Sequence, residues 1–149
     1  MATGTQNKVV PLISSGTAGP LGVLHLPRLW LKLTLASMDA LPEGYDECGS
    51  GFDAMTLSAL GLDRQKTIDF VRHNRPSYME FEEWAVANGK ADKDAIERHN
   101  AAVRGYNHGD ELGAKMREAS KIRDASVKDA VSLNTIEDLD EIHRQLTRA

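Results

Sequence analysis

The chain has 149 residues, of which 41% are hydrophobic and 27% are charged, and its formal net charge at pH 7 is −4. This length suits one domain with a substantial hydrophobic core. No stretch of the sequence is strongly basic with interleaved aromatic residues, so a nucleic-acid partner is not expected.

The only cysteine is Cys48, so no disulfide framework is possible within the chain. This cysteine usage is typical of a reducing cytoplasm. The first residues lack a basic segment followed by a long apolar run, so we expect no signal peptide. No apolar run approaches the length of a membrane span. We therefore predict a cytoplasmic protein without a membrane partner.

Residues 1–21 are expected to form an irregular N-terminal arm. They are polar, then briefly apolar, and then rich in Ser, Gly and Thr. The stretch 14–19 superficially resembles a phosphate-binding loop. It lacks the Gly-Lys-Ser/Thr ending and the flanking strand that such a loop needs, so it is a weak signal.

The most apolar run of the chain follows, and it predicts a buried helix from Pro27 to about Ala40. Proline is well tolerated at the first position of a helix. Arg28 and Lys32 are four residues apart and so share one face. His25 comes just before the first turn, near the unpaired amides of the helix start. Two cations, a histidine and a helix N-terminus together favour an anion.

Capping residues and glycines predict the helices that follow. Asp53 is expected to cap a short helix over 54–60, after a loop at 41–53 that is rich in acids and glycines. Thr135, paired with Asp138, is expected to cap the last helix, 136–148. The other predicted helices span 64–73, 78–88, 92–104 and 111–123. The fold class predicted for residues 22–149 is a single compact all-α domain of about six helices.

The predicted C-terminal helix, 136–148, has a narrow apolar seam between charged residues. The members of this seam are Ile136, Leu139, Ile142 and Leu146. A seam this narrow packs on a single neighbour. Because a two-fold pair is the commonest closed assembly, we predict a homodimer formed across this helix.

Several of these residues together resemble a bacterial family, the domain-of-unknown-function 5069 family. The shared positions are Gly22, Leu26-Pro27-Arg28, Lys32, the acidic loop with Tyr45 that closes on Gly51-Phe52-Asp53, Leu60-Gly61-Leu62-Asp63, and Trp84. The resemblance covers residues 22–100 and extends to the tail around 134–143. Leu31 and Thr34 stand where relatives often have Asp and Arg. The resemblance implies a small bacterial helical protein without a settled activity, and Arg28, Lys32 and Asp53 are matched motif positions.

Arg28 and Lys32 lie on a helix too apolar to hold unpaired cations, so carboxylates must meet them. The nearby candidates are Asp46, Glu47 and Asp53, of which Asp53 is expected to be best placed. One carboxylate satisfies one cation well. We therefore predict that Asp53 pairs with one cation and that the other faces a cavity able to take a ligand anion.

Two functions remain open. The first is a small cofactor-independent enzyme, of the lyase, hydratase or isomerase type, acting on an anionic small organic molecule. His25, Lys32 and Asp53 are its candidate catalytic residues. Its candidate substrate-binding residues are Arg28, Asp46 and Trp84. The second is a non-enzymatic helical binding or assembly module in which the same charges are structural.

Other chemistries receive less support from the sequence. No two histidines have the three- or four-residue spacing of a helical metal site, so neither a metal nor a cofactor is expected. A Ser-His-Asp triad could be assembled from Ser14, His25 and Asp53, but the sequence has no nucleophile elbow. Trp84 is an inward-facing aromatic, and such residues more often belong to the core than to a site.

Overall fold

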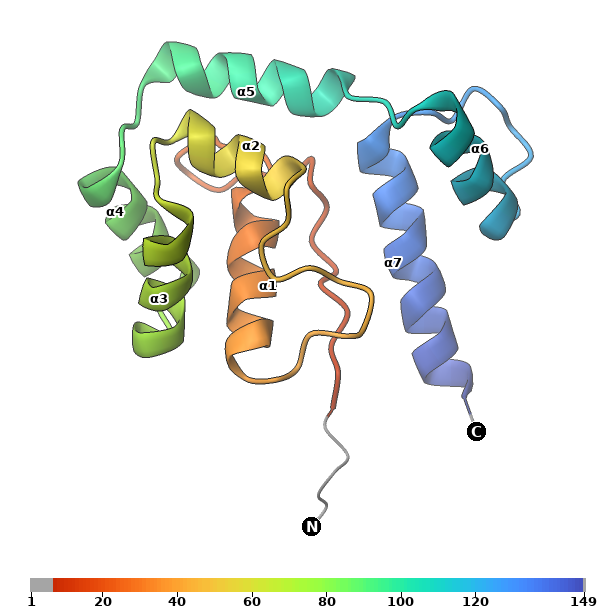
Figure 1. Cartoon of the computed structure of the whole chain (residues 1–149), viewed down its shortest axis with the longest axis horizontal. Coiled ribbons are helices and arrows are strands. Elements are labelled where there is room, and N and C mark those ends of the chain that lie inside the picture. Colours follow the sequence, from red (N-terminus) through yellow and green to blue (C-terminus); the bar gives the residue numbers. More distant parts are fainter. Residues whose placement is uncertain (1–6, 149) are drawn as a thin grey trace.

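The computed structural model describes residues 7–148 as seven α-helices, with no strand among them (Figure 1). The predicted all-α single domain is confirmed, and its seven helices correspond to the seven predicted segments, one more than the stated total of about six. Residues 1–6 of the predicted arm, and residue 149, lie outside the described part. The helices are α1 (Leu26–Ser37), α2 (Phe52–Ala59), α3 (Arg64–Asn74), α4 (Tyr78–Asn88), α5 (Lys93–Gly105), α6 (Asp110–Ala119) and α7 (Ala130–Thr147).

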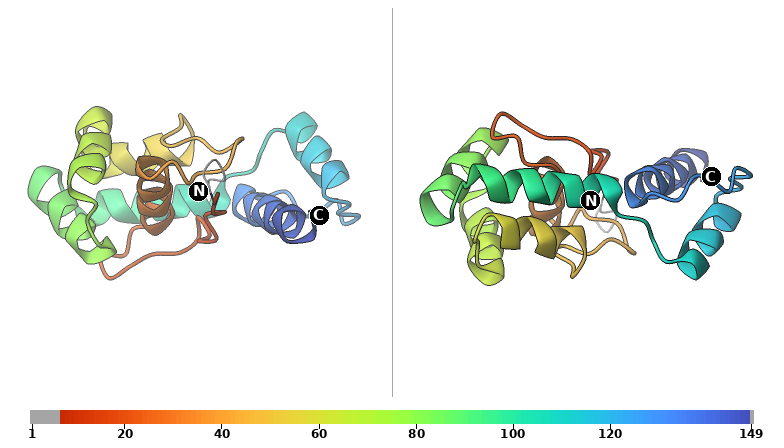
Figure 2. Two further views of the ribbon diagram at one scale, coloured as in Figure 1. Left: turned by 90° about the horizontal axis from the view of Figure 1, so that it is seen from below. Right: turned by 90° about the horizontal axis from the view of Figure 1, so that it is seen from above.

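Helix α1 lies at the centre of the larger group of helices. In Figure 1, α3 and α4 flank it on one side, α2 and α5 cross one of its ends, and α6 and α7 stand on the other side. The two further views show that α6 and α7 form a separate end of an elongated molecule (Figure 2). The hydrophobic core is formed by residues of all five helices from α1 through α5. It includes Leu29, Leu33, Val71 and Phe81, all of which are fully buried.

Helix α1 begins one residue before the predicted Pro27 and ends at Ser37 rather than near Ala40. The end comes early because Asp39 has a left-handed backbone, with φ of 54°. The arm reinforces this stop, since Lys8 Nζ donates to the carbonyl oxygen of Asp39 over 2.9 Å. A non-glycine residue in the left-handed region ends a helix as a C-terminal glycine does.

Three of the predicted helix starts are confirmed by their caps. The side chains of Asp63 and Asp92 each accept a backbone N–H of the first turn, and Ser77 with Glu80 forms a complete capping box. These caps satisfy amides that the helix itself leaves unpaired.

Two predicted caps are wrong. Helix α2 starts at Phe52 after Gly51, so Asp53 lies inside its first turn, and its carboxylate makes tertiary contacts instead of capping. Helix α7 starts at Ala130, six residues before the predicted start, because Asp129 accepts from the backbone N–H of Ser132. Thr135 is therefore internal, and its hydroxyl donates to the carbonyl oxygen of Val131.

The described part of the arm packs against the helices without forming a regular element. Val10 and Ser15 are buried, and Val9 N–H donates to the carbonyl oxygen of Ala40.

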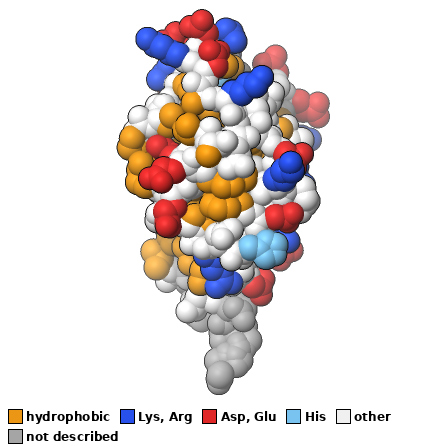
Figure 3. Space-filling model, turned by 90° about the vertical axis from the view of Figure 1, so that its left-hand side faces the viewer, with side chains coloured by type: hydrophobic (Ala, Val, Ile, Leu, Met, Phe, Trp, Pro, Cys, Tyr) orange, Lys and Arg blue, Asp and Glu red, His pale blue; other side chains and the backbone are white. Residues whose placement is uncertain are grey.

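On the end of the molecule formed by α3 and α4, Figure 3 shows hydrophobic side chains surrounded by charged ones. Met79 and Val86 of α4 are 45% and 47% exposed. Among the described helices, none is both long and apolar enough to cross a bilayer.

Candidate functional site

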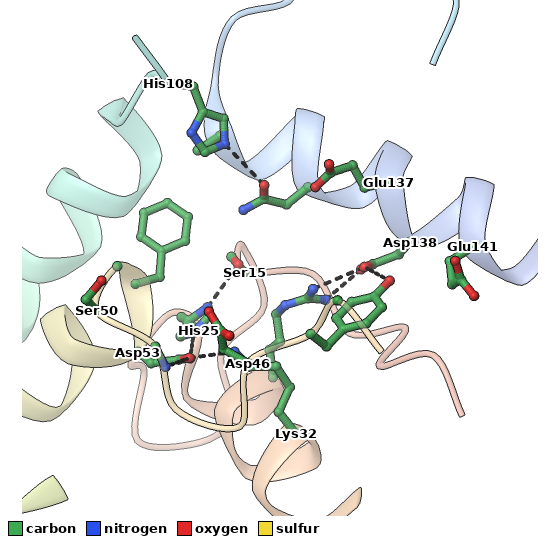
Figure 4. A pocket seen from close by; sticks show the side chains of 18 of the residues that line it. Ser15, His25, Lys32, Asp46, Ser50, Asp53, His108, Glu137, Asp138 and Glu141 are labelled. Atoms are coloured by element: carbon green, nitrogen blue, oxygen red, sulfur yellow. Dashed lines mark hydrogen bonds and ion pairs between the residues drawn. The ribbon is translucent and has the colours of Figure 1, made fainter. Parts of the chain in front are cut away.

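A cleft of about 570 Å³ opens between the start of α1, the loop before α2, and α7. Figure 4 shows its side chains converging from these elements. The polar and charged side chains that line it are Ser15, His25, Arg28, Lys32, Glu43, Tyr45, Asp46, Ser50, Asp53, Tyr106, His108, Asn134, Glu137, Asp138, Glu141 and Arg144. A cleft of this size, with convergent polar groups, is where a small ligand is expected to bind.

His25 stands at the centre of the polar network and has a strained backbone. It is the residue before α1, and its φ of 74° lies in the left-handed region, which a side chain with a Cβ rarely adopts. Such outliers occur where the surrounding structure forces them, and they cluster at functional sites.

Helix α5 holds the segment that leads into His25. Asn100 accepts from the backbone N–H of Leu24 over 2.9 Å and donates to the carbonyl oxygen of Gly22 over 2.7 Å. The buried His99 bonds to the carbonyl oxygen of Leu24 through its Nε2 over 2.9 Å. These three bonds keep the turn before α1 in place and thereby orient the His25 ring toward the cleft.

Asp53 is buried and accepts three hydrogen bonds. Its Oδ1 lies 2.6 Å from His25 Nε2, and its Oδ2 accepts from Lys32 Nζ over 2.5 Å and from the backbone N–H of Gly49 over 2.8 Å. Burial opposes ionisation, but the bond from His25 and the charge of Lys32 lower the pKa of Asp53 to about 2. The carboxylate is therefore ionised at neutral pH.

The ring of His25 is neutral at neutral pH, because burial lowers its pKa below 6.5 and the charges of Lys32 and Arg28 lower it further, against the opposing effect of Asp53. An ionised carboxylate can only accept, so the Nε2 proton must point toward Asp53. Nδ1 is then unprotonated and accepts from the Ser15 hydroxyl, 2.9 Å away. The result is a hydrogen-bonded line from Ser15 through His25 to Asp53.

Arg28 is paired as completely as Lys32. Its Nη1 and Nη2 donate to the two carboxylate oxygens of Asp138 over 2.6 and 3.1 Å, and Nη1 also donates to the carbonyl oxygens of Pro11 and Ile13. Tyr45 donates its hydroxyl to the same carboxylate over 2.9 Å. The prediction that one cation would face the cavity unpaired is therefore wrong, because α7 supplies a second buried carboxylate.

The cleft carries more negative than positive side chains. Six carboxylates line it against Arg28, Lys32 and Arg144. Arg144 is also paired, with Glu141 over 2.8 Å. Among the described residues, three lining acids have no ion-pair partner: Glu43, Asp46 and Glu137. Burial raises the pKa of Glu137.

The structure brings five of the six predicted site residues to the cleft, namely His25, Arg28, Lys32, Asp46 and Asp53. Trp84 is not among its lining residues. It stacks on Phe70 with ring centroids 4.6 Å apart and packs against the core. The reason is local, since the inward face of α4 meets α1 and α3 rather than the cleft.

Sequence reasoning missed Ser15 and Asp138. The Ser-His-Asp triad considered from the sequence contained Ser14, but the Oγ of Ser14 accepts the backbone N–H of Gly16. The serine that faces His25 is the next residue, Ser15. The sequence marked Asp138 only as the partner of Thr135 in a helix cap, and no local signal could pair it with Arg28, which lies 110 residues away along the chain.

Across residues 7–148, no group of three or more His, Cys, Asp or Glu side chains is arranged to hold a metal ion. No protein-family model matches the chain, and no curated protein matches it either. The resemblance to the domain-of-unknown-function 5069 family therefore stays a prediction.

Proposed function

We propose that the chain is a small cofactor-independent enzyme that uses His25 as a general base on a small organic molecule bound in the cleft. The observation that carries this proposal is the line Ser15–His25–Asp53. A base needs an unprotonated nitrogen at neutral pH, a fixed tautomer and access to the reacting proton. Burial keeps His25 neutral, Asp53 fixes the tautomer, and the ring lines the cleft.

Lys32 supports this role by sharing Asp53. Its charge keeps the carboxylate ionised, and that carboxylate stabilises the imidazolium formed when His25 takes a proton. Among the described residues, Asp53 is its hydrogen-bond partner, so the ammonium has further N–H groups for negative charge that develops in the cleft. Such a base serves those lyase, hydratase and isomerase reactions that begin by removing a proton.

The charge of the cleft bears on the substrate. An anion would have to compete with Asp53 for Lys32 or with Asp138 for Arg28, and it would pass the unpaired acids Glu43 and Asp46. These charges favour a substrate that is neutral or positive at the end facing the opening. The anionic small molecule expected from the sequence stays a prediction, and a screen should contain both kinds.

The test is conversion of a library of small carboxylic acids, esters, amides and amines, followed by NMR, with wild type and His25→Gln. We expect wild type to convert at least one compound and the variant to be about 100- to 10,000-fold slower, the usual contribution of a general base. His73→Gln is the matched control, because His73 is exposed on α3, away from the cleft. Equal conversion by wild type and His25→Gln contradicts the proposal.

The second candidate, a binding or assembly module, is favoured by one observation. Among the described residues, every buried polar side-chain atom has a hydrogen-bond partner, so the network is complete without a ligand. In that case compounds bind to wild type and to His25→Gln, and neither protein changes them.

Assembly through α7 stays a prediction that applies to both candidates. Leu139 and Leu146 lie seven residues apart on one face of this helix and are 51% and 78% exposed. If they pack across a two-fold axis, Leu146→Glu should halve the mass measured by light scattering and leave the melting temperature of the monomer unchanged. Truncation after Asn134 is a poorer test, because it also removes Asp138 and strands Arg28. A monomeric wild type contradicts the homodimer.

A further inference from the structure

Among the described residues, Ser15 is the one group from which His25 is already placed to take a proton. The Ser15 hydroxyl donates to Nδ1 over 2.9 Å, and both residues line the cleft. Ser50 also lines the cleft but is exposed, and it has no such contact with His25 in the described structure. A hydroxyl that donates to an oriented, neutral imidazole is the arrangement that activates a serine nucleophile.

We propose that Ser15 is a nucleophile and that the cleft carries out acyl transfer from small esters or thioesters through an acyl-serine intermediate. This inference rests on the proposed role of His25 as a base, and it replaces the broader set of reactions with a hydrolase or acyltransferase reaction. In this site Asp53 bonds to Nε2 of the imidazole and Ser15 bonds to Nδ1. In the familiar Ser-His-Asp triad the two nitrogens have the opposite partners.

The reaction needs no group beyond the acyl donor and water. Ser15 Oγ bonds to the acyl carbon as its proton moves to His25 Nδ1, and the bond from that carbon to the leaving oxygen or sulfur breaks as the leaving atom takes the proton. Water then attacks the acyl carbon and gives its proton to Nδ1. The Oγ–carbon bond breaks, and Ser15 recovers the proton. The net change is hydrolysis, and the Nε2 proton stays toward Asp53 throughout.

The positive charge of Arg28 favours these steps. Each tetrahedral intermediate is negative, and the guanidinium of Arg28 is bonded to the carbonyl oxygen of Ile13, two residues before Ser15. A cation is thus held against the segment that carries the nucleophile. Asp138, Tyr45 and the arm fix this cation, so it need not reorganise during the reaction.

Burial limits the size of the acyl group. Ser15 is only 2% exposed, and Gly16 follows it with the side chain of Val131 nearby. We expect that a small acyl group such as acetyl reaches the Oγ and that a long or branched one clashes with the arm and α7. We therefore expect acetyl esters to react faster than octanoyl esters of the same alcohol.

The experiment uses p-nitrophenyl acetate with the full chain, quenched in acid and mapped by peptide mass spectrometry, together with the rate of p-nitrophenolate release. We expect acetylation of residue 15 in wild type and in Ser58→Ala, because Ser58 is exposed on α2 and does not line the cleft. We expect none at that residue in Ser15→Ala or His25→Gln, with release at least about 100-fold slower in both. In Ser15→Cys the acetyl group should be transferred to the sulfur of the substituted side chain. The product is a thioester, which hydroxylamine cleaves.

The results separate this inference from the function on which it rests. Acetylation confined to other residues, or equal at residue 15 in wild type and His25→Gln, overturns the nucleophile. If Ser15→Ala stays folded by circular dichroism and keeps the wild-type rate while His25→Gln loses it, Ser15 is not the nucleophile but His25 remains the base. If all variants and wild type show the same rate, both proposals fail.

Discussion

Asp53→Ala should lower the free energy of unfolding by about 3–5 kcal/mol, the usual cost of removing one partner from a buried ion pair. The carboxylate accepts from His25, Lys32 and the Gly49 amide, and all three donors would lose their partner at once. Lys32 is 7% exposed, so its charge cannot turn fully to water. Urea unfolding followed by circular dichroism measures the change.

Two variants control this prediction. Asp46→Ala removes an exposed acid of the same cleft, which has no ion-pair partner among the described residues, and it should change stability by less than about 0.5 kcal/mol. Lys32→Met should be milder than Asp53→Ala, because Asp53 keeps His25 and Gly49 as donors. If Lys32→Met destabilises as strongly as Asp53→Ala, the ion pair itself dominates rather than the shared carboxylate.

The pH dependence of stability should carry the signature of the same group. The pKa of Asp53 falls from 3.8 to about 2 on folding, so its contribution is present above about pH 4 and is lost as the pH falls toward 2. The shift corresponds to about 2 kcal/mol. His25 adds a loss of stability that begins at higher pH. Because its pKa is lowered in the folded protein, the unfolded chain takes up a proton at this residue below about pH 6.5 and the folded protein does not. In His25→Gln this loss at higher pH should be absent.

Asp138→Ala should destabilise the fold by a similar amount, on the order of 3–5 kcal/mol, and should also loosen α7. The Asp138 carboxylate accepts hydrogen bonds from both terminal nitrogens of Arg28 and from the Tyr45 hydroxyl. These bonds connect α7 to α1 and to the loop before α2. Loss of the carboxylate strands a buried guanidinium. Limited proteolysis should cut between 106 and 129 faster than in wild type, and urea unfolding gives the energy.

Glu141→Ala is the matched control on the same helix. Within residues 7–148, Glu141 pairs only with Arg144, three residues further along and 58% exposed, and such surface pairs contribute less than about 1 kcal/mol. The double variant Arg28→Met with Asp138→Leu should recover part of the loss, because no charge is left unpaired. If Asp138→Ala and Glu141→Ala have equal effects, Asp138 does not hold α7 in place.

The sequence by itself determined most of the helices, and the reason is that their signals are local. Caps such as Asp63 and the Ser77–Glu80 box act over three residues, within the reach of one helical turn. The apolar run after Gly22 predicted that α1 is buried. Because a buried cation needs a carboxylate, it also predicted partners for Arg28 and Lys32, and Asp53 is one of them.

Only the tertiary structure decided which groups meet in the cleft. Asp138 reaches Arg28 because the fold brings α7 within side-chain reach of the start of α1, and no spacing along the chain encodes a contact between residues 110 positions apart. Which of two adjacent serines faces His25 depends on the turn of the arm, which local bonds to Ser14 close and which Arg28 and His25 fix against the start of α1. For Asp53 the sequence predicted both a helix cap and an ion pair, and packing alone selected the ion pair, because a cap and a buried acceptor of three hydrogen bonds use the same residue type.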